Sequence, residues 1–332
     1  MLTGKKILVT GGAGFIGSNL CERLLTDGNV VLCLDNFLTG KKRNIEPFFN
    51  QPGFQLLEGD IRDKSVCEKA VKGVDLVLHQ AALGSVPRSV NDPLTTNDIN
   101  INGFLNMLWA SKEEGIKRFV YAASSSTYGD SAELPKVEER IGKPLSPYAV
   151  TKYVNELYAK VFSDLYGMEV IGLRYFNVFG KNQDPDGAYA AAIPKFIKAL
   201  LHHQSPEIFG DGSQTRDFTY VENVIQANIL AATADKQEAL NTVYNVAYGE
   251  RITLNELVIL MQELLSRFDP EIKNIKLVYG KERAGEVKHS LASVEKAKKI
   301  LGYQPTHDLK RGLTEAVDWY VKNLGENVKA GK

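Results

Sequence analysis

The stretch Ile7-Leu8-Val9-Thr10-Gly11-Gly12-Ala13-Gly14-Phe15-Ile16-Gly17 decides the fold. Its opening apolar run is typical of a buried parallel strand. The glycines follow at the spacing G-x-x-G-x-x-G. This spacing predicts a tight turn at Gly11, close approach of a phosphate at Gly14 and close packing of helix on strand at Gly17. A helix beginning here would offer its N–H groups and the positive end of its dipole to phosphates.

The residues that follow complete a nucleotide-binding unit. Ile16, Leu20 and Leu24 recur every fourth residue, as on a buried helix face, and Gly28 is suited to end that helix. A second apolar strand over 30–34 leads to Asp35, at the distance where an acid can hold the ribose hydroxyls of an adenosine. A glycine triplet alone would also fit an ordinary tight turn. Strand, helix and acid together predict a dinucleotide site.

Composition narrows the class of protein. The 332 residues can bury a large core, and 40 basic residues balance 40 acidic ones, which argues against a nucleic-acid or membrane-surface binder. No apolar run is long enough to span a membrane, and no signal peptide is visible. Cys21, Cys33 and Cys67 lack a paired spacing, so we expect buried thiols in a reducing cytoplasm. The pair His202-His203 fits a surface position better than a metal site, so we expect no metal.

Strand and helix patterns alternate through the first half of the chain. Strands are expected over residues 55–58, 74–79, 118–123 and 170–175, and helices over residues 63–72, 94–114 and 150–165. This alternation predicts an α/β protein with a Rossmann-type, doubly wound parallel sheet that binds ligands at the carboxyl ends of its strands. After Gly180 the alternation ends, and Thr253 to Glu256 matches a capping box.

The change of pattern predicts a smaller, mixed α+β lobe. We expect residues 1–180 to form the nucleotide-binding domain, with return elements from the C-terminal half of the chain. Residues 181–310 would form the ligand-binding lobe, and residues 311–332 a C-terminal helix and tail.

A phenol and an ammonium group lie one helical turn apart. Tyr148 and Lys152 stand at i and i+4, and Ser146-Pro147 match the N-cap and first residue of a helix. A cation one turn away would lower the pKa of tyrosine from its ordinary value of about 10, as would an oxidised nicotinamide. This spacing alone more often marks a solvated helix face. It gains weight from Ser124-Ser125-Ser126, whose hydroxyls are expected at the same edge of the sheet, although a polar turn would also explain them.

Together these motifs resemble the extended short-chain dehydrogenases/reductases. The resemblance covers almost the whole chain and rests on the glycine stretch, Asp60-Ile61, Ser124 to Gly129, Tyr148 to Lys152, Arg174 to Gly180, Gly210-Asp211-Gly212 and Arg216-Asp217. Within that group the chain is most similar to the UDP-hexose 4-epimerases. The particular resemblance is to the branch that acts on UDP-N-acetylglucosamine and UDP-N-acetylgalactosamine, in residues 82–88, 124–129 and 183–185.

The resemblance implies NAD as the cofactor. The residues that would hold it are Gly11, Gly14, Phe15, Ile16, Asp35, Asn36, Asp60, Ile61, Gln80, Ala81, Ala82, Tyr148, Lys152 and Tyr175. Asp35 favours NAD over NADP because a carboxylate repels a 2′-phosphate, although a cation in the loop 41–43 could accept that phosphate. Members of the family often carry an Asn close to position 99. Here the sequence is Asp98-Ile99-Asn100, and no cofactor contact is assigned to it.

The same resemblance implies a UDP-sugar site. Its residues would be Gly84, Ser85, Ser124, Ser125, Ser126, Tyr148, Asn177, Gln183, Ala191, Ile193, Lys195, Ile208, Phe209, Gly210, Arg216, Arg283, Glu286 and Ser290. Arg216 and Arg283 would pair with the diphosphate, which suits guanidinium groups, although either arginine alone fits a surface ion pair. Ser290 would stand on the C2 side of the hexose, where a small residue leaves room for an N-acetyl group. It also fits a simple turn before the next helix.

The implied reaction inverts carbon 4 of a UDP-linked N-acetylhexosamine, and of plain UDP-hexoses if the pocket admits them. Tyr148 would take the proton of the 4-hydroxyl, Lys152 would bind the nicotinamide ribose, and Ser124 would steady the same sugar oxygen. A 4-epimerase of UDP-hexuronic acids differs only in pocket detail. A dehydratase or decarboxylase is disfavoured, because Ser125 and Ser126 stand where related dehydratases keep an Asp-Glu pair. A non-catalytic NAD-binding regulator would not need the three catalytic groups together.

Similar epimerases pair two long helices of each subunit. The corresponding residues would be 96–114 and 148–166, which predicts a homodimer joined through a four-helix bundle. Met107 and Trp109 are candidate contacts, although core packing explains them equally well. The expected partners are a UDP-sugar and a second copy of the chain, with no nucleic acid and no membrane.

Overall fold

A parallel sheet forms the centre of the molecule. The computed structural model describes residues 2–186, 191–281 and 288–324. The main sheet of this part has seven strands, all parallel, in the order β11-β6-β5-β4-β1-β2-β3. The strands are β1 (Lys6–Thr10), β2 (Val30–Asp35), β3 (Phe54–Glu58), β4 (Leu76–His79), β5 (Arg118–Ser124), β6 (Glu169–Tyr175) and β11 (Thr242–Val246). The direction of winding reverses between β1 and β4, which confirms the predicted doubly wound fold and opens a crevice at the strands' carboxyl ends.

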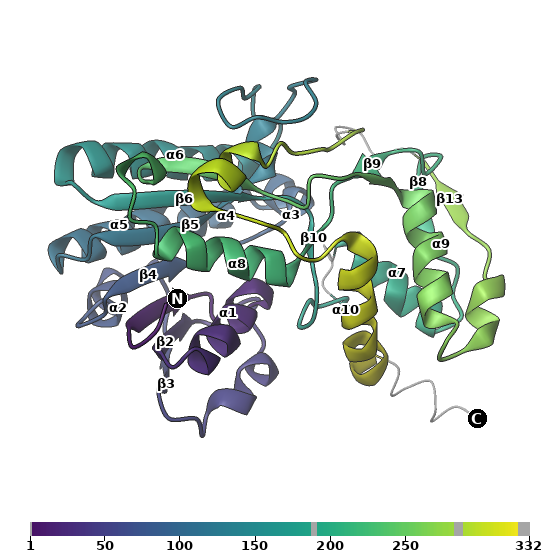
Figure 1. Cartoon of the computed structure of the whole chain (residues 1–332), viewed down its shortest axis with the longest axis horizontal. Coiled ribbons are helices and arrows are strands. Elements are labelled where there is room, and N and C mark those ends of the chain that lie inside the picture. Colours follow the sequence, from purple (N-terminus) through teal and green to yellow (C-terminus); the bar gives the residue numbers. More distant parts are fainter. Residues whose placement is uncertain (1, 187–190, 282–287, 325–332) are drawn as a thin grey trace.

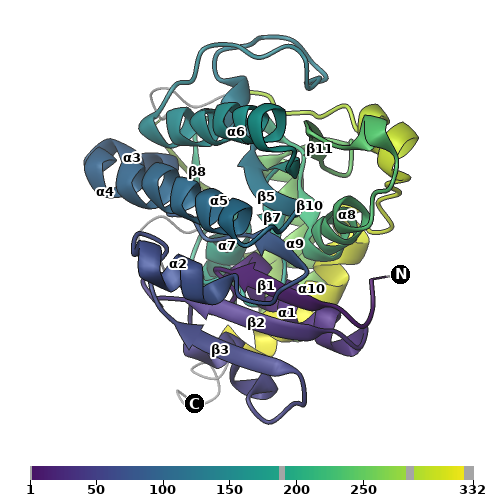
Figure 2. The same ribbon diagram turned by 90° about the vertical axis from the view of Figure 1, so that its left-hand side faces the viewer.

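Alternate residues of β1 face two separate cores. Ile7 and Val9 belong to one cluster of buried side chains and Leu8 to the other, as expected for a strand buried on both faces. The helices that cover the first face are α1 (Phe15–Thr26) and α8 (Val221–Ala232), and those that cover the second are α2 (Lys64–Ala70), α5 (Phe104–Glu113) and α6 (Pro147–Tyr166). Figure 2 shows the two helical layers on opposite sides of the sheet. Gly28 adopts φ +80° just past the end of α1, as predicted.

A smaller lobe lies beside the sheet, at the right of Figure 1. Its helices α7 (Ala192–Leu201), α9 (Leu254–Leu265) and α10 (Leu309–Leu324) pack against one another. Its two-stranded sheets are β7 (Val178–Phe179) with β10 (Thr219–Tyr220), β8 (Glu207–Phe209) with β13 (Val278–Gly280), and β9 (Thr215–Arg216) with β12 (Ile252–Thr253). The predicted capping box begins α9, because Thr253 and Glu256 each accept a hydrogen bond from the other's backbone N–H. The exact domain boundaries stay a prediction.

The helix predicted over 94–114 is confirmed in outline but is not one regular α-helix. α3 (Val86–Asn91) and α4 (Pro93–Asn97) lead into π-helical turns over Asp98–Gly103, which continue into α5. Turns of this kind often occur at functional sites. The shorter helical turns are η1 (Lys42–Asn44), η2 (Glu46–Phe48), η4 (Ser125–Tyr128), η5 (Gln237–Ala239), η6 (Pro270–Asn274) and η7 (Ala297–Leu301). Within the described ranges, no helix combines the length and apolar character needed to cross a bilayer.

Candidate active site

The carboxyl ends of six strands surround a cavity of about 390 Å³. Gly11 follows β1, Asp35 ends β2, Asp60 comes just after β3, Gln80 follows β4, and Ser124 and Tyr175 end β5 and β6. All of the residues predicted to hold the cofactor line this cavity. The structure therefore brings the whole predicted set together, while the role of each residue stays a prediction.

The glycine stretch has the geometry that its spacing predicts. Gly11 adopts φ +67° and donates its N–H to the carbonyl of Leu34 at 2.8 Å. A Cβ on Gly17 would lie 2.0 Å from the carbonyl oxygen of Gly11, so helix and loop are packed too closely for any larger residue. Gly14 is the N-cap of α1 and supplies no side-chain hydrogen bond. The start of α1 therefore presents backbone N–H groups without a side chain over them, as a phosphate site requires.

Asp35 joins the second strand to the glycine loop. Its carboxylate accepts hydrogen bonds from the N–H of Ala13 at 2.9 Å and of Phe37 at 2.8 Å. Burial raises the pKa of Asp35, and these backbone bonds oppose the rise. The loop cation Lys41 forms an ion pair with Asp184 at 3.4 Å. It is therefore directed to a carboxylate at the start of the smaller lobe.

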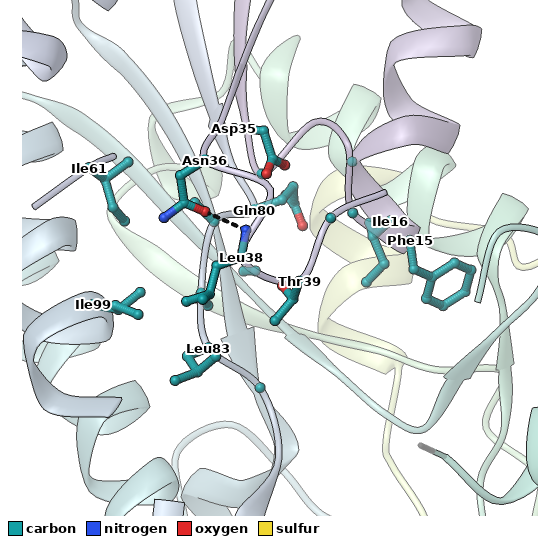
Figure 3. A pocket seen from close by; sticks show the side chains of 18 of the residues that line it. Phe15, Ile16, Asp35, Asn36, Leu38, Thr39, Ile61, Gln80, Leu83 and Ile99 are labelled. Carbon is teal, nitrogen blue, oxygen red and sulfur yellow. Dashed lines mark hydrogen bonds between the residues drawn. The ribbon is translucent and has the colours of Figure 1, made fainter. Parts of the chain in front are cut away.

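One end of the cavity combines a polar edge with apolar walls. Asp60 accepts from Asn36 Nδ2 at 2.7 Å and from Arg62 Nη2 at 2.7 Å. The hydrogen bonds from Arg62 lower the pKa of Asp60 to about 2. Figure 3 shows apolar side chains around the same end, among them Ile61 and Ile99. A polar edge beside apolar faces suits a planar heterocycle such as adenine. The start of α1, the carboxylate of Asp35 and this end of the cavity together fit a dinucleotide.

Three polar side chains meet at the other end of the cavity. Ser146 caps α6 by accepting the N–H of Ala149 at 3.1 Å, which places Tyr148 in the first turn as predicted. Ser124 forms a hydrogen bond with the Tyr148 side chain. One turn later Lys152, only 3% exposed, has its Nζ 6.0 Å from the centre of the Tyr148 ring. All three residues line the cavity.

The predicted lowering of the Tyr148 pKa by Lys152 is wrong, because the pKa is raised. Burial raises the pKa of Tyr148, and its hydrogen bond with Ser124 opposes that rise. The ammonium of Lys152 donates instead to the carbonyl of Ala122 at 2.7 Å, and burial lowers its own pKa to about 8. Further stabilisation of a phenolate can come from the two remaining N–H donors of Lys152 and from bound molecules.

Two neighbouring cavities of the described residues take in part of the predicted sugar-nucleotide set. Gly84, Ser124, Tyr148 and Asn177 line the main cavity, and Asn177, Ala191, Ile193 and Arg216 line an adjoining one of about 200 Å³. The residues that line neither are Ser85, Ser125, Ser126, Gln183, Lys195, Ile208, Phe209, Gly210 and Ser290. Arg283 and Glu286 lie outside the described residues. Asn177 and Val178 line both cavities, so the two spaces meet at the start of β7.

Sequence reasoning missed Asn100. This side chain, 1% exposed, exchanges hydrogen bonds with both backbone groups of Leu83, at 2.7 and 3.1 Å. It also donates to Thr151 Oγ1 at 3.1 Å. Asn100 thus fixes the loop after β4 to the helix that carries Tyr148. Polar neighbours such as Asp98 and Asn102 hide any signal in the sequence, and only the buried position shows that this amide must find partners.

A second missed feature is the buried ion pair between Arg174 and Glu156. Arg174 donates to both carboxylate oxygens of Glu156, at 2.9 and 2.7 Å. Glu156 follows Lys152 by one helical turn and opposes the effect of burial on the pKa of Lys152. The spacing Tyr148-Lys152-Glu156 could have indicated this third polar position on one helix face. Among the described residues, no three His, Cys, Asp or Glu side chains are grouped to hold a metal ion.

Comparison with known proteins defines the class. Residues 7–247 match the NAD dependent epimerase/dehydratase family. The chain belongs to this family, and its cofactor is NAD. A UDP-glucose 4-epimerase of Mycolicibacterium smegmatis is 32% identical over 95% of this chain and 98% of its own length.

Two solved structures are similar throughout. The UDP-N-acetylglucosamine 4-epimerase of Methanobrevibacter ruminantium, in complex with UDP-N-acetylmuramic acid, is 40% identical with a TM-score of 0.90, over 97% of this chain and 99% of its own. The UDP-glucuronic acid 4-epimerase of Bacillus cereus, with UDP-glucuronic acid and NAD, is 32% identical with a TM-score of 0.85, over 96% and 99%. These similarities place the chain among NAD-dependent UDP-sugar 4-epimerases.

Proposed function

We propose that this enzyme interconverts UDP-N-acetylglucosamine and UDP-N-acetylgalactosamine by inverting C4 of the sugar. The observation that carries the proposal is the meeting of Ser124, Tyr148 and Lys152 at the strand ends beside the glycine loop. The 40% identity with a UDP-N-acetylglucosamine 4-epimerase supports the choice of sugar. The pyrophosphate would lie at the start of α1, the adenosine beside Asp35 and Asp60, and the nicotinamide between Gln80 and Tyr175.

The catalytic side chains have separable roles in this proposal. When bound, NAD supplies hydride transfer to and from C4 of the sugar and a positive charge that lowers the pKa of a neighbouring phenol. Tyr148 holds the proton of the 4-hydroxyl while C4 is a ketone and returns it afterwards. Ser124 has a single hydroxyl proton, which it can donate to the same sugar oxygen in place of Tyr148 when the sugar is bound. Lys152 uses one of its three N–H donors on Ala122, which leaves two for a ribose and for the phenolate.

A dehydratase needs an acid and a base near C5 and C6 of the sugar, and the described cavity lacks such a pair. Its carboxylates belong to Asp35 and Asp60, which lie at the adenosine end. Next to Ser124 stands Ser126, whose hydroxyl donates to Ser124 Oγ at 2.9 Å. Hydroxyl groups there can orient a sugar but cannot remove water from it.

Small residues support an N-acetylated sugar. Gly84 lines the main cavity, and a Cβ added there would meet nothing within 4 Å. Ser290 is held beside β9, where its N–H donates to the carbonyl of Thr215 at 3.1 Å, one residue from the cavity-lining Arg216. We therefore place the N-acetyl group between the loop at Gly84 and the segment at Ser290.

The test is incubation of the purified enzyme with UDP-N-acetylglucosamine, UDP-glucose and UDP-glucuronate, each followed by chromatography for its C4 epimer. We expect the N-acetylated sugar to be converted with the highest kcat/KM. Faster conversion of UDP-glucuronate would favour the hexuronate alternative, and loss of water from any substrate would identify a dehydratase. No conversion of any of the three would contradict the proposal.

We also propose a homodimer formed through α6 and its neighbours. Apolar side chains on α6 are exposed at helical spacing, with Leu157 49%, Val161 46% and Leu165 68% exposed. Leu94 on the adjoining α4 is 82% exposed. Surface helices normally expose polar residues, so such a face favours burial against a second copy.

Light scattering on the double variant Leu157→Glu/Leu165→Glu tests the dimer. We expect it to be monomeric, because two buried carboxylates would oppose association. Ile259→Glu is the matched control, since Ile259 is 59% exposed on α9 in the other lobe. A double variant that keeps the mass of the unmodified protein, or an unmodified protein that is monomeric, would contradict this interface.

A further inference from the structure

Gln80 and Tyr175 are joined to a third residue outside the cavity. Tyr175 OH donates to Gln80 Oε1 at 3.1 Å, and Gln80 Nε2 donates to Asn228 Oδ1 at 3.1 Å. Asn228 Nδ2 donates back to Tyr175 OH at 2.8 Å, which closes a ring of three hydrogen bonds. Gln80 and Tyr175 line the cavity, whereas Asn228 does not and is completely buried.

The direction of the ring is fixed by the helix that carries Asn228. Its Nδ2 also donates to the carbonyl of Val224 at 2.8 Å, one turn earlier on α8. A carbonyl can only accept, so a rotated Asn228 amide would face Val224 with its oxygen and Gln80 Nε2 with its own nitrogen. The hydroxyl proton of Tyr175 is therefore directed at Gln80, and burial raises the pKa of Tyr175. Tyr175 is thus held as a neutral phenol whose proton is directed to Gln80.

The ring spans three elements at the nicotinamide end. Gln80 follows β4 and Tyr175 ends β6, and β5 lies between these strands in the sheet. α8 packs against all three strands from the face opposite α6. We propose that Asn228 is a positioning residue that sets the spacing and orientation of Gln80 and Tyr175 and thereby the seat of the nicotinamide. This inference rests on the proposed placement of the nicotinamide but not on the identity of the sugar.

Loss of Asn228 would leave Gln80 Nε2 without its acceptor and Tyr175 OH without its donor, while the bond from Tyr175 OH to Gln80 Oε1 could stay. Gln80 Nε2 would have to turn towards another acceptor or into the cavity, because an unpaired donor is costly. Either movement changes the surface that receives the nicotinamide, and small displacements of reacting groups reduce rates strongly. The sugar-nucleotide side, at Arg216 and Ser290, is built from other segments and would not change.

The experiment measures NAD and UDP binding separately in Asn228→Ala. We expect NAD to leave the purified holoenzyme about tenfold faster and to rebind about tenfold more weakly, which is the effect of one weakened contact between a displaced Gln80 or Tyr175 and the nicotinamide. The affinity for UDP should not change, and kcat should fall with little change in the KM of the sugar nucleotide. Unchanged NAD release and rebinding would overturn the proposal, and equal weakening of NAD and UDP would indicate only a structural role.

Two further variants complete the test. Asn223→Ala is the matched control, because Asn223 is also buried on α8 but bonds to His307 and Thr306, away from the cavity. It should keep NAD as the unmodified enzyme does, and NAD loss equal to that of Asn228→Ala would overturn the assignment. Asn228→Asp serves where the alanine variant does not fold. A protonated carboxyl group can replace the amide in the ring, so its NAD affinity relative to the unmodified enzyme should recover as pH falls. If the ratio of the two NAD affinities does not change with pH, the proposed role of the ring of hydrogen bonds is contradicted.

Discussion

The nucleotide end of the cavity comes from consecutive β-α units, whereas the sugar end comes from segments that are distant in sequence. Gly11, Asp35 and Asp60 follow successive strands of one parallel sheet, so the rules of that sheet place them together. At the sugar end, Asn177 lies between β6 of the main sheet and β7, and Arg216 belongs to β9 of the smaller lobe. The first end is fixed by local backbone geometry, and the second depends on how two parts of the chain meet. Substitutions at the nucleotide end should therefore affect NAD binding, whereas those at the sugar end should affect substrate specificity.

The largest expected effect is at the point where the two ends meet. Tyr148→Phe removes the group that we propose takes the 4-hydroxyl proton, and loss of a general base lowers rates by about 10²–10⁴. NAD should stay bound, because the glycine loop is untouched. Steady-state turnover and NAD content are the measurements, with Tyr153→Phe, on the same helix but away from the cavity, as the control. Turnover above roughly a tenth of the unmodified enzyme would exclude Tyr148 as the base.

At the nucleotide end, Gly17→Ala should abolish tight NAD binding. The added methyl carbon would lie 2.0 Å from the backbone oxygen of Gly11, so the loop or the start of α1 must move. Overpacking of this kind typically costs about 1–3 kcal/mol, and here the obstacle is backbone rather than a flexible side chain. We expect NAD affinity to fall by more than about tenfold. A thermal unfolding curve shows whether the loss of NAD affinity comes from loss of the fold. A folded variant that binds NAD normally would show that NAD binding does not need the close packing at Gly17.

At the sugar end, Ser290→Tyr should change specificity rather than remove activity. A bulky ring on the C2 side would exclude the N-acetyl group by steric overlap, which is a stronger effect than the loss of one contact. We expect kcat/KM for UDP-N-acetylglucosamine to fall at least about tenfold while that for UDP-glucose is spared. Equal loss on both substrates, or no loss on either, would place the selective residue elsewhere.

At the joint between the two halves, the expected effect is on stability and not on activity. Asp217, completely buried, accepts from the N–H of Gly249 after β11 and of Ala292 beside the Ser290 segment, at 3.3 and 3.1 Å. Burial raises its pKa to about 7, whereas an unfolded aspartate titrates at about 4. The folded protein thus keeps a proton that the unfolded chain releases. The stability from this group is complete below about pH 4 and is lost as pH rises through about 7.

Asp217→Asn should remove that part of the pH dependence, because an amide does not titrate in this range. Denaturant unfolding at several pH values between 4 and 8 measures it, and the change in slope should amount to a few kcal/mol across the range. The two proteins are compared by the slope of their unfolding free energy against pH. Their absolute stabilities also differ, because an amide cannot accept the N–H groups of Gly249 and Ala292 equally well. Identical slopes in the two proteins would show that Asp217 does not carry the raised pKa.

The contrast between local geometry and contacts of distant segments also explains which features the sequence could predict. Gly17, Asp35 and the cap at Ser146 follow rules that connect neighbouring residues, and the structure confirms their geometry. Asn100 and Asn228 have no such signal, because their meaning lies in partners on other elements. A buried amide becomes interpretable only when the groups around it are known. For the same reason the expected effect of Lys152 on Tyr148 was wrong, since burial and the carbonyl of Ala122 are tertiary features.

The proposed reaction inverts the configuration at C4 of a sugar molecule, and the hydrogen on C4 does not exchange with solvent. The most direct measurement is proton NMR of UDP-N-acetylglucosamine incubated with the enzyme in D₂O. Because Tyr148 exchanges only the hydroxyl proton and the C4 hydride returns to the same sugar, UDP-N-acetylgalactosamine should form with its C4 hydrogen fully retained. Deuterium at C4, or no change of configuration, would contradict this account.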